Sequence, residues 1–186
     1  WAKIPAELRD LKQWCVAGAD KSPITPSGRR APVTDESTWS TFEAAANSAA
    51  AKGHAIGFVI TATDPFACVD LDVKPNTPAE DLARHAAIVS ALESYTERSL
   101  SGRGIHVWVK AAIGEGARRD SVEVYSQARF MICTGDVERD LPIADRQDLL
   151  TNMVDQMRPI IDNKPTPEGP ESVADDVIIS RAMAAT

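Results

Sequence analysis

The sequence is poor in cysteine and in aromatic residues, and it contains no long apolar run. Its three cysteines, Cys15, Cys68 and Cys133, form no CxxC pair, which argues against a structural zinc site and against a disulfide framework. This cysteine usage predicts a protein of a reducing cytoplasm. No apolar stretch approaches the roughly 20 residues that span a bilayer, and no signal-peptide pattern opens the chain. The sequence therefore favours neither a membrane-spanning protein nor a disulfide-rich secreted domain.

The chain also lacks an excess of positive charge. Its formal net charge is −7, with 20 Lys and Arg against 27 Asp and Glu. This balance argues against nonspecific binding of nucleic acid by the whole surface, but it is compatible with a local basic groove. With 186 residues, of which 44% are hydrophobic, the chain is long enough for one globular domain and an appendage. Because the first residue is Trp1 rather than Met, we expect the sequence to be a piece of a longer protein.

Hydrophobic periodicity predicts a mixture of helices and strands. Helices are expected over residues 4–14, 40–53, 77–92 and 144–159, the second and third opened by capping boxes. Strands are expected over residues 55–61, 66–73, 104–110, 121–125 and 130–134. We assign residues 1–160 to one domain. Residues 161–172 are rich in proline and acidic residues, which predicts a linker, and residues 173–186 begin a helical segment that we expect to lead into a region outside this sequence.

Three of the expected strands alternate branched apolar residues with polar ones. The polar positions are Asp70 and Asp72 in the first strand, His106 and Lys110 in the second, and Glu123 in the third. Because successive side chains of a strand point to opposite faces, each strand buries one apolar face and presents its polar residues on the other. If the three strands lie in one antiparallel sheet, these polar side chains line a single surface.

The spacing of Asp70 and Asp72 favours a metal site. Two residues apart on one strand, their carboxylates lie roughly 6–7 Å apart, and at an effective dielectric constant of about 20 they repel by about 2–3 kcal/mol. A divalent cation removes this repulsion, and Glu123 completes an oxygen-rich site suited to two Mg²⁺ or Mn²⁺ ions. The alternative is that the two aspartates lie on the solvated outer face of an edge strand.

A glycine-rich segment precedes His106. In SLSGRGIH, Gly102 and Gly104 let the backbone approach a ligand closely, and exposed N–H groups there are suited to phosphate. The segment leads into a strand rather than a helix, so neither a P-loop nor a Rossmann fingerprint fits. We expect His106 to hydrogen-bond a triphosphate oxygen and Lys110 to neutralise its charge. The alternative for His106 is a histidine that only satisfies the turn.

Together, these motifs resemble those of a known family. A hydrophobic strand bearing Asp70 and Asp72, the later segment SGRGIH that ends at His106, and a hydrophobic strand with Glu123 resemble the three motifs of archaeo-eukaryotic primases. More closely, the chain is similar to the primase-polymerase domain of phage and plasmid replication proteins over about residues 3–140. The similarity is spread over the segments IPAELRDLKQW, KSPITPSGRRAPVTDESTWSTFEAA, IGFVI, DPFACVDLD, SYTERSLSGRGIHVWVK and VEVYSQARFMICTGD.

The resemblance implies an α+β fold, the archaeo-eukaryotic primase core, with a mixed or antiparallel sheet of RRM-like type, a second α/β unit and flanking helices. The motif residues take the roles of metal-binding catalytic acids (Asp70, Asp72, Glu123) and of the nucleotide-phosphate contact (His106). Ser101, Gly102 and Gly104 are expected to shape the nucleotide pocket, Lys110 and Arg129 to contact phosphate or template, and Lys21, Arg29 and Arg30 to meet template phosphates. Trp108 departs from the family pattern and either stacks a base or packs.

The resemblance implies a template-directed DNA primase and polymerase that uses two Mg²⁺ or Mn²⁺ ions. It would add nucleotides from NTPs or dNTPs to a primer on single-stranded DNA during phage or plasmid replication, in the cytoplasm of a bacterial host. A C-terminal helicase would follow in the full-length protein.

Two other functions stay open. A metal-dependent nuclease uses the same acids to activate water, but it has no need of a phosphate loop or of His106 and Lys110. A noncatalytic module that binds single-stranded or origin DNA needs a basic groove with stacking aromatic residues, whereas aromatic residues make up only 5% of this chain.

Overall fold

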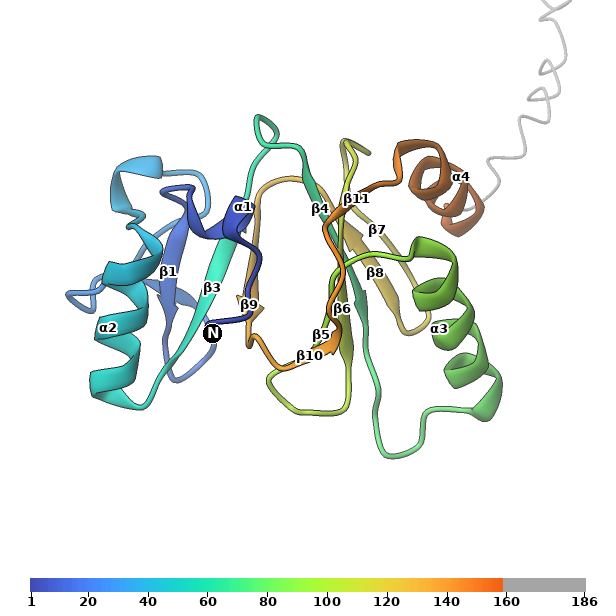
Figure 1. Cartoon of the computed structure of the whole chain (residues 1–186), viewed down its shortest axis with the longest axis horizontal. Coiled ribbons are helices and arrows are strands. Elements are labelled where there is room, and N and C mark those ends of the chain that lie inside the picture. The colour runs from blue at the N-terminus through green and yellow to red at the C-terminus, as the bar shows by residue number, and fades with distance from the viewer. Residues whose placement is uncertain (159–186) are drawn as a thin grey trace, which may run out of the picture.

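Residues 1–158 of this computed structural model form two β-sheets with the longer helices on their outer sides (Figure 1). The first sheet has the strand order β2-β1-β3-β9, and every neighbouring pair is antiparallel. Its strands are β1 (Trp14–Ala17), β2 (Pro23–Ile24), β3 (Ala55–Ile60) and β9 (Arg129–Cys133). This half of the molecule also holds α1 (Ala6–Arg9), the short 3-10 helix η1 (Glu36–Thr38) and α2 (Phe42–Lys52).

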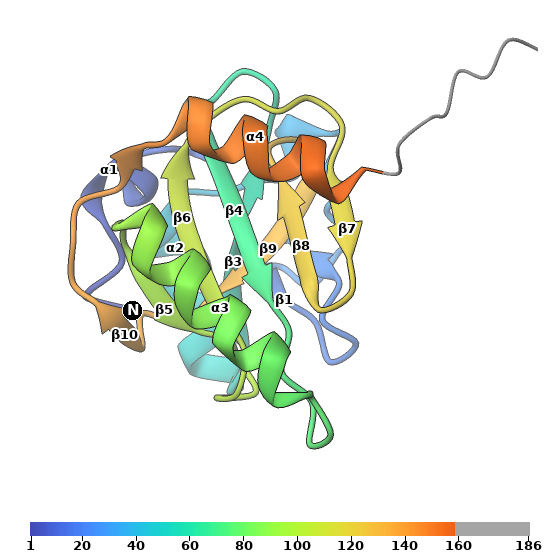
Figure 2. The ribbon, with the colours of Figure 1, turned by 90° about the vertical axis from the view of Figure 1, so that its right-hand side faces the viewer.

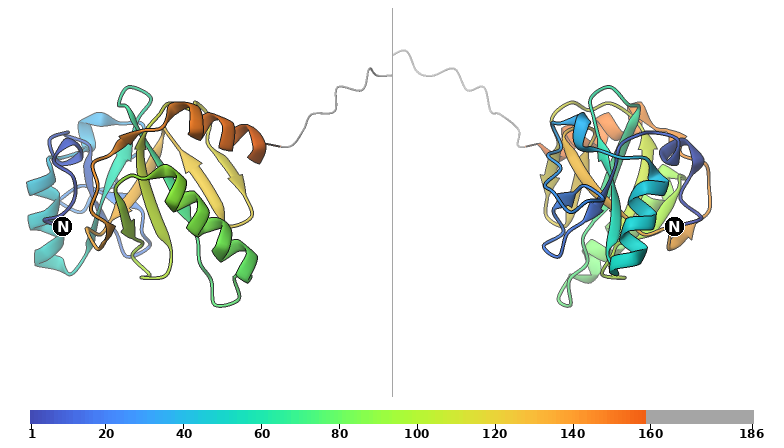
Figure 3. Two further views of the ribbon diagram at one scale, coloured as in Figure 1. Left: turned by 45° about the vertical axis from the view of Figure 1, so that its right-hand side comes forward. Right: turned by 90° about the vertical axis from the view of Figure 1, so that its left-hand side faces the viewer.

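The second sheet has the order β10-β5-β6-β4-β8-β7, and β11 runs parallel to β6 beside this path. Its strands are β4 (Phe66–Leu71), β5 (Thr96–Arg98), β6 (Ile105–Lys110), β7 (Ala117–Arg119), β8 (Val122–Tyr125), β10 (Val137–Arg139) and β11 (Ala144–Asp145). The helices α3 (Ala79–Leu92) and α4 (Gln147–Met157) pack on this sheet. They lie on the opposite side of the molecule from α2 (Figure 3).

The second sheet buries its two faces in different ways. On one face, Val69 and its neighbours pack beneath α3 and α4, which cross in front of the strands (Figure 2). On the other face, Phe66 and Trp108 join an apolar cluster that includes Phe58 of the first sheet. Because side chains alternate along a strand, β4 and β6 supply both layers of the core at once.

One face of the second sheet carries Asp70 and His106. The other half of this face is apolar. Along β4, Phe66 and Cys68 precede Asp70 on this face, and both are buried. Along β6, Trp108 follows His106 and is fully buried, with its ring edge-to-face with that of Phe58 at 5.9 Å between centroids. Trp108 is therefore a core residue that packs the two sheets together, and its ring is not available to stack a base.

The expected α+β fold with antiparallel sheets and flanking helices is confirmed. The helix expected over residues 4–14 is wrong in its second half, because α1 ends at Arg9 and the backbone of Trp14 hydrogen-bonds with that of Ser40 to begin β1. The expected linker over 161–172 and helical segment over 173–186 lie outside the described residues. Of the helices within residues 1–158, none combines the length and the apolar character needed to cross a membrane.

Phe58 provides a test of this core. It is fully buried and its ring contacts Trp14, Phe66 and Trp108 in edge-to-face geometry. We expect Phe58→Ala to lower the free energy of unfolding by about 3–5 kcal/mol, because a large cavity would open between the sheets. Urea unfolding followed by tryptophan fluorescence measures this, with Leu82→Ala on the exposed side of α3 as control. If Phe58→Ala lowered the free energy of unfolding as little as Leu82→Ala does, the two sheets would not share a core at Phe58.

Candidate active site

Three strands of the second sheet bring the predicted motif residues together. β4 lies between β6 and β8 and is antiparallel to both. Asp70 is directly opposite His106 on one side and directly opposite Glu123 on the other. Directly opposite residues of an antiparallel pair project from the same face of the sheet with Cβ atoms about 4.5–5.5 Å apart. These three residues therefore share one surface, as the sequence predicts for strands in a single antiparallel sheet.

A cleft of about 720 Å³ opens beside these residues, between the two sheets. Its lining on the side of the second sheet includes Asp70, Asp72 and His106, together with the loop over residues 99–104. On the side of the first sheet, β9 and Pro23 of β2 contribute to the lining. Four cationic residues, Lys21, Lys74, Arg103 and Arg129, also line the cleft. The cleft thus joins carboxylates, an imidazole and several cations in one space.

Asp70 stands at the centre of the site. Burial raises the pKa of its carboxyl group above the usual range, and the charges of Glu123 and Asp72 raise it further. His106 and Arg129 act in the opposite direction, and His106 Nε2 lies 3.6 Å from Asp70 Oδ1. The ionised carboxylate is therefore held in an environment that disfavours negative charge.

Glu123 is held by cations of the protein. Arg118 Nε lies 3.0 Å from Glu123 Oε1, and Arg129 Nη2 lies 3.6 Å from Glu123 Oε2. Tyr125 donates its hydroxyl proton to the same Oε2, and burial together with this hydrogen bond raises the pKa of Tyr125 to about 12. The Arg129 guanidinium also stacks over the Tyr125 ring, with Cζ at 4.1 Å from the centroid.

Asp72 is the least enclosed of the three predicted metal-binding acids. It directly follows β4, its side chain is 50% exposed, and its carboxylate pairs with Lys74 Nζ at 3.4 Å. Within residues 1–158, no three His, Cys, Asp or Glu side chains are grouped closely enough to hold a metal ion. In this arrangement Asp72 and Glu123 face protein cations, so each would have to exchange its partner to share a metal ion with Asp70.

The glycine-rich segment forms a tight loop against the end of β4. Gly102 has φ of +73°, a left-handed conformation that favours glycine, and its N–H donates to the Ser99 carbonyl at 2.8 Å. A Cβ on Gly104 would lie 2.9 Å from the Leu71 carbonyl oxygen, so this loop approaches β4 closely only because the residue is glycine. Ser101 and Gly104 line the cleft beside His106.

Lys110 lies away from the cleft, although it shares a strand with His106. It is the last residue of β6, and its Nζ pairs with Glu7 at 2.6 Å. Four residues of strand separate the two side chains by about 13 Å along β6. The expectation that Lys110 would neutralise a phosphate held at His106 does not agree with this placement, because alternation fixes the face of a residue but not its position along the strand.

The other predicted basic residues divide between two places. Arg129 and Lys21 line the cleft. Arg29 and Arg30 line a separate hollow beside Trp39 and several hydroxyl side chains. The template contacts expected from Lys21, Arg29 and Arg30 stay predictions, and they would have to extend along the first sheet.

Sequence reasoning missed Arg103, Arg118 and Glu97. Arg103 lies inside the glycine-rich segment and lines the cleft. Arg118 is directly opposite Glu123, and Glu97 is directly opposite His106. These two complete a row of directly opposed charged residues over five adjacent strands, which we call the cross-strand row: Arg118 (β7), Glu123 (β8), Asp70 (β4), His106 (β6) and Glu97 (β5). For Arg118, the signal in the sequence was the alternation within residues 117–125, which is visible only once β7 and β8 are paired.

Comparison with known proteins agrees with the motifs. No protein-family model matches the chain. The chain is 31% identical over 150 residues, 73% of its length, to a curated protein of Nitratiruptor phage NrS-1 named DNA Primase-polymerase. The match covers 21% of that protein, so the chain spans about a fifth of the length of this relative.

The raised pKa of Asp70 predicts an effect on stability. A carboxyl group whose pKa is raised by folding contributes stability that is fully present below its unfolded pKa of about 3.9 and is lost as the pH rises through its folded pKa. At pH 7 the ionised Asp70 therefore costs stability, and we expect Asp70→Asn to raise the midpoint of thermal unfolding. The gain should shrink toward zero at pH 3, where Asp70 is neutral.

Thermal unfolding followed by circular dichroism at pH 3, 5 and 7 measures this difference. Asp140→Asn, on an exposed loop, is the matched control and should leave the midpoint unchanged. A midpoint of Asp70→Asn at or below that of the wild type at pH 7 would show that the contact with His106 outweighs burial and repulsion.

Proposed function

This chain is a relative of a phage DNA primase-polymerase, as its three motifs predicted, and from this premise we propose that it carries the nucleotidyl-transfer site of such an enzyme. The proposal is that the domain adds nucleotides from dNTPs or NTPs to a primer on a single-stranded DNA template. The observation that carries it is the register of β4, which sets Asp70 opposite both His106 and Glu123 beside a cleft with cationic lining.

The incoming triphosphate is assigned to the side of the cleft formed by His106 and the 99–104 loop. His106 presents Nε2 beside Asp70 on the cleft side, and Arg103 and Lys74 line the same space. A triphosphate carries several negative charges, so these cations favour its binding beside the carboxylates. Phosphoryl transfer depends chiefly on positioning and on charge stabilisation, which this arrangement supplies.

Asp70, Asp72 and Glu123 are the residues proposed to hold two Mg²⁺ or Mn²⁺ ions. The donor set fits such ions, because hard cations prefer carboxylate oxygens and because the charges of Glu123 and Asp72 add to the effect of burial in raising the pKa of Asp70. When bound, such ions lower the pKa of an attacking hydroxyl group and stabilise a departing pyrophosphate. Arg118 and Arg129 would release Glu123 at that point, and both guanidiniums would then be free to pair with phosphate.

The partners of the reaction follow from the same proposal. The template is single-stranded DNA, the primer end donates its 3′-hydroxyl group, and a second nucleotide donates the hydroxyl group for the first bond of a primer. The wider setting is replication of a phage or plasmid in the cytoplasm of a bacterial host, with a C-terminal helicase in the full-length protein.

A primer-extension assay tests the proposal. We expect wild-type protein with Mg²⁺ or Mn²⁺ to lengthen a labelled primer on a single-stranded template, and we expect Asp70→Ala to reduce product formation to background. Parallel reactions with dNTPs and NTPs give the sugar preference. Circular dichroism and thermal unfolding of Asp70→Ala establish that the fold is retained, and Asp140→Asn is the control for an unrelated acidic residue.

Each other outcome has a definite meaning. A primer that shortens in a metal-dependent reaction supports a nuclease. Binding of single-stranded DNA without any change in primer length supports a noncatalytic module. If Asp70→Ala extended the primer at the wild-type rate, neither Asp70 nor the proposed site would take part in the reaction.

A further inference from the structure

Glu97 is a fully buried carboxylate behind the candidate active site. It lies on β5, directly opposite His106, and has no exposed surface. Within residues 1–158, the only ion-pair partner of Glu97 is His106, whose Nδ1 lies 3.8 Å from Glu97 Oε1. Burying a carboxylate is costly unless it is paired and hydrogen-bonded, so the charge calls for a specific reason.

Backbone and hydroxyl donors hold this carboxylate in place. Tyr95 donates its hydroxyl proton to Glu97 Oε2 at 3.0 Å, and the Gly135 N–H donates to the same oxygen at 2.8 Å. The Thr134 N–H donates to Oε1 at 3.3 Å. Oε2 therefore has two donors and Oε1 has one, which leaves Oε1 free to accept a hydrogen bond from the side of His106.

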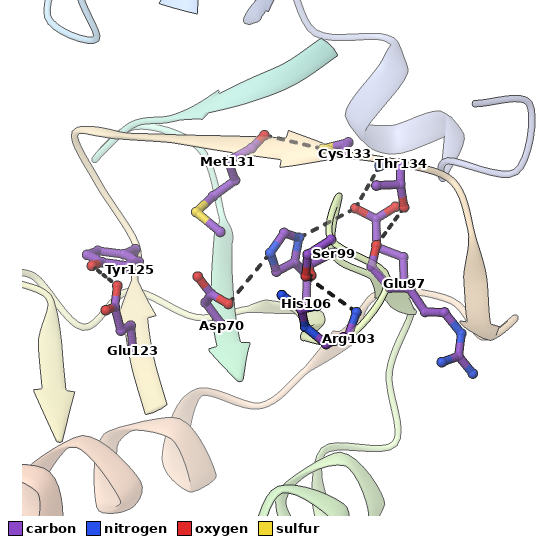
Figure 4. A network of polar contacts seen from close by, with 12 residues as sticks. Asp70, Glu97, Ser99, Arg103, His106, Glu123, Tyr125, Met131, Cys133 and Thr134 are labelled. Carbon is purple, nitrogen blue, oxygen red and sulfur yellow. Dashed lines mark hydrogen bonds and ion pairs between the residues drawn. The ribbon is translucent and has the colours of Figure 1, made fainter. Parts of the chain in front are cut away.

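His106 lies between two carboxylates, as Figure 4 shows, with Asp70 on its cleft side and Glu97 behind it. Its side chain is 7% exposed, and Nδ1 is buried without a hydrogen-bond partner among the described residues. A carboxylate only accepts hydrogen bonds, so the ring nitrogen that faces Glu97 has to be a donor. The ring is thereby fixed with Nδ1 toward Glu97 and Nε2 toward the cleft.

We propose that Glu97 is a positioning residue for His106, orienting its ring so that Nε2 meets the phosphate of the incoming nucleotide. This inference deepens the proposed function and rests on it. The distance of 3.8 Å between Nδ1 and Oε1 is longer than a hydrogen bond. The proposal requires this distance to shorten when a phosphate binds Nε2, as hydrogen bonds of a site do on ligand binding. Carboxylates that orient a functional histidine in this manner are a general device of protein sites.

Glu97 also ties His106 to the other wall of the cleft. Thr134 and Gly135 lie in the segment that leads from β9 of the first sheet to β10 of the second. Their N–H groups hold Glu97, and Glu97 faces His106, so the ring is placed relative to both sheets. The competing explanation is that Glu97 only anchors this segment and has no bearing on His106.

The nitrogen spectrum of the histidine rings separates the two explanations without any nucleotide or metal. The chain has three histidines, and His106→Ala identifies the signals of His106. In ¹⁵N-histidine-labelled wild-type protein, we expect both ring nitrogens of His106 to carry a proton, because Nδ1 faces Glu97 and Nε2 faces Asp70 and would donate to phosphate. In Glu97→Gln we expect the Nδ1 signal to shift toward that of an unprotonated nitrogen, because the charged acceptor behind Nδ1 is lost. Unchanged His106 signals in Glu97→Gln would overturn the proposal.

Tyr95→Phe is the matched control. It removes one hydrogen bond to Glu97 but leaves the carboxylate facing His106. We expect it to lower thermal stability and to leave the His106 signals as in the wild type. If Tyr95→Phe changes these signals as much as Glu97→Gln does, Glu97 acts only through the general stability of the region. Should Glu97→Gln fail to fold, Glu97→Asp keeps the charge and retracts it from the ring, and an altered His106 spectrum is then expected.

Steady-state kinetics give the second readout. We expect Glu97→Gln to raise KM for the incoming nucleotide by about 10–100-fold, the range typical of partners that orient a binding residue, with a smaller change in kcat. In a His106→Ala background the same substitution should leave KM unchanged. A fall in kcat with an unchanged KM indicates only a loss of folded protein and contradicts positioning. Wild-type protein that makes no product contradicts the proposed function, whereas the nitrogen spectrum still tests the orientation of His106.

Discussion

The cross-strand row is the feature on which the candidate site depends. Its five residues are directly opposed in the sheet, so their contacts follow from strand pairing rather than from loop conformation. A shift of β4 by one residue would turn Asp70 toward α3 and α4 and bring Val69 or Leu71 into the cleft. The apolar face beneath the helices opposes such a shift, so the same burial that stabilises the fold also fixes the register of the site.

Acidic and basic residues alternate along most of the cross-strand row. Arg118 pairs with Glu123 at one end, and His106 lies between Asp70 and Glu97 at the other. The exception is the pair Asp70 and Glu123, where two carboxylates are neighbours. Burial raises the pKa of Asp70, and the charge of Glu123 raises it further. Asp70 is thus the point of the row at which a cation would relieve both the burial of a carboxylate and the repulsion from its neighbours.

The sequence predicted which side chains of a strand share one face, but not what each face packs against. Alternation placed Asp70, His106 and Glu123 on one surface, and the capping pattern placed α2 up to Gly53, whose φ is +66°. It did not predict that half of this surface packs against the first sheet, which depends on contacts such as that between Trp108 and Phe58. The sequence did not predict the burial of Glu97, because a glutamate in a three-residue strand normally faces solvent.

The apolar cluster that joins Phe58 to Phe66 and Trp108 has a consequence for how the cleft can move. It extends through both sheets, so the two walls of the cleft are parts of one close-packed interior. Moving one wall away from the other would break these ring contacts. In a hinge closure, by contrast, two domains move while the core of each stays intact. The two walls of the cleft are therefore held at a fixed separation, and the shape of the cleft is preformed.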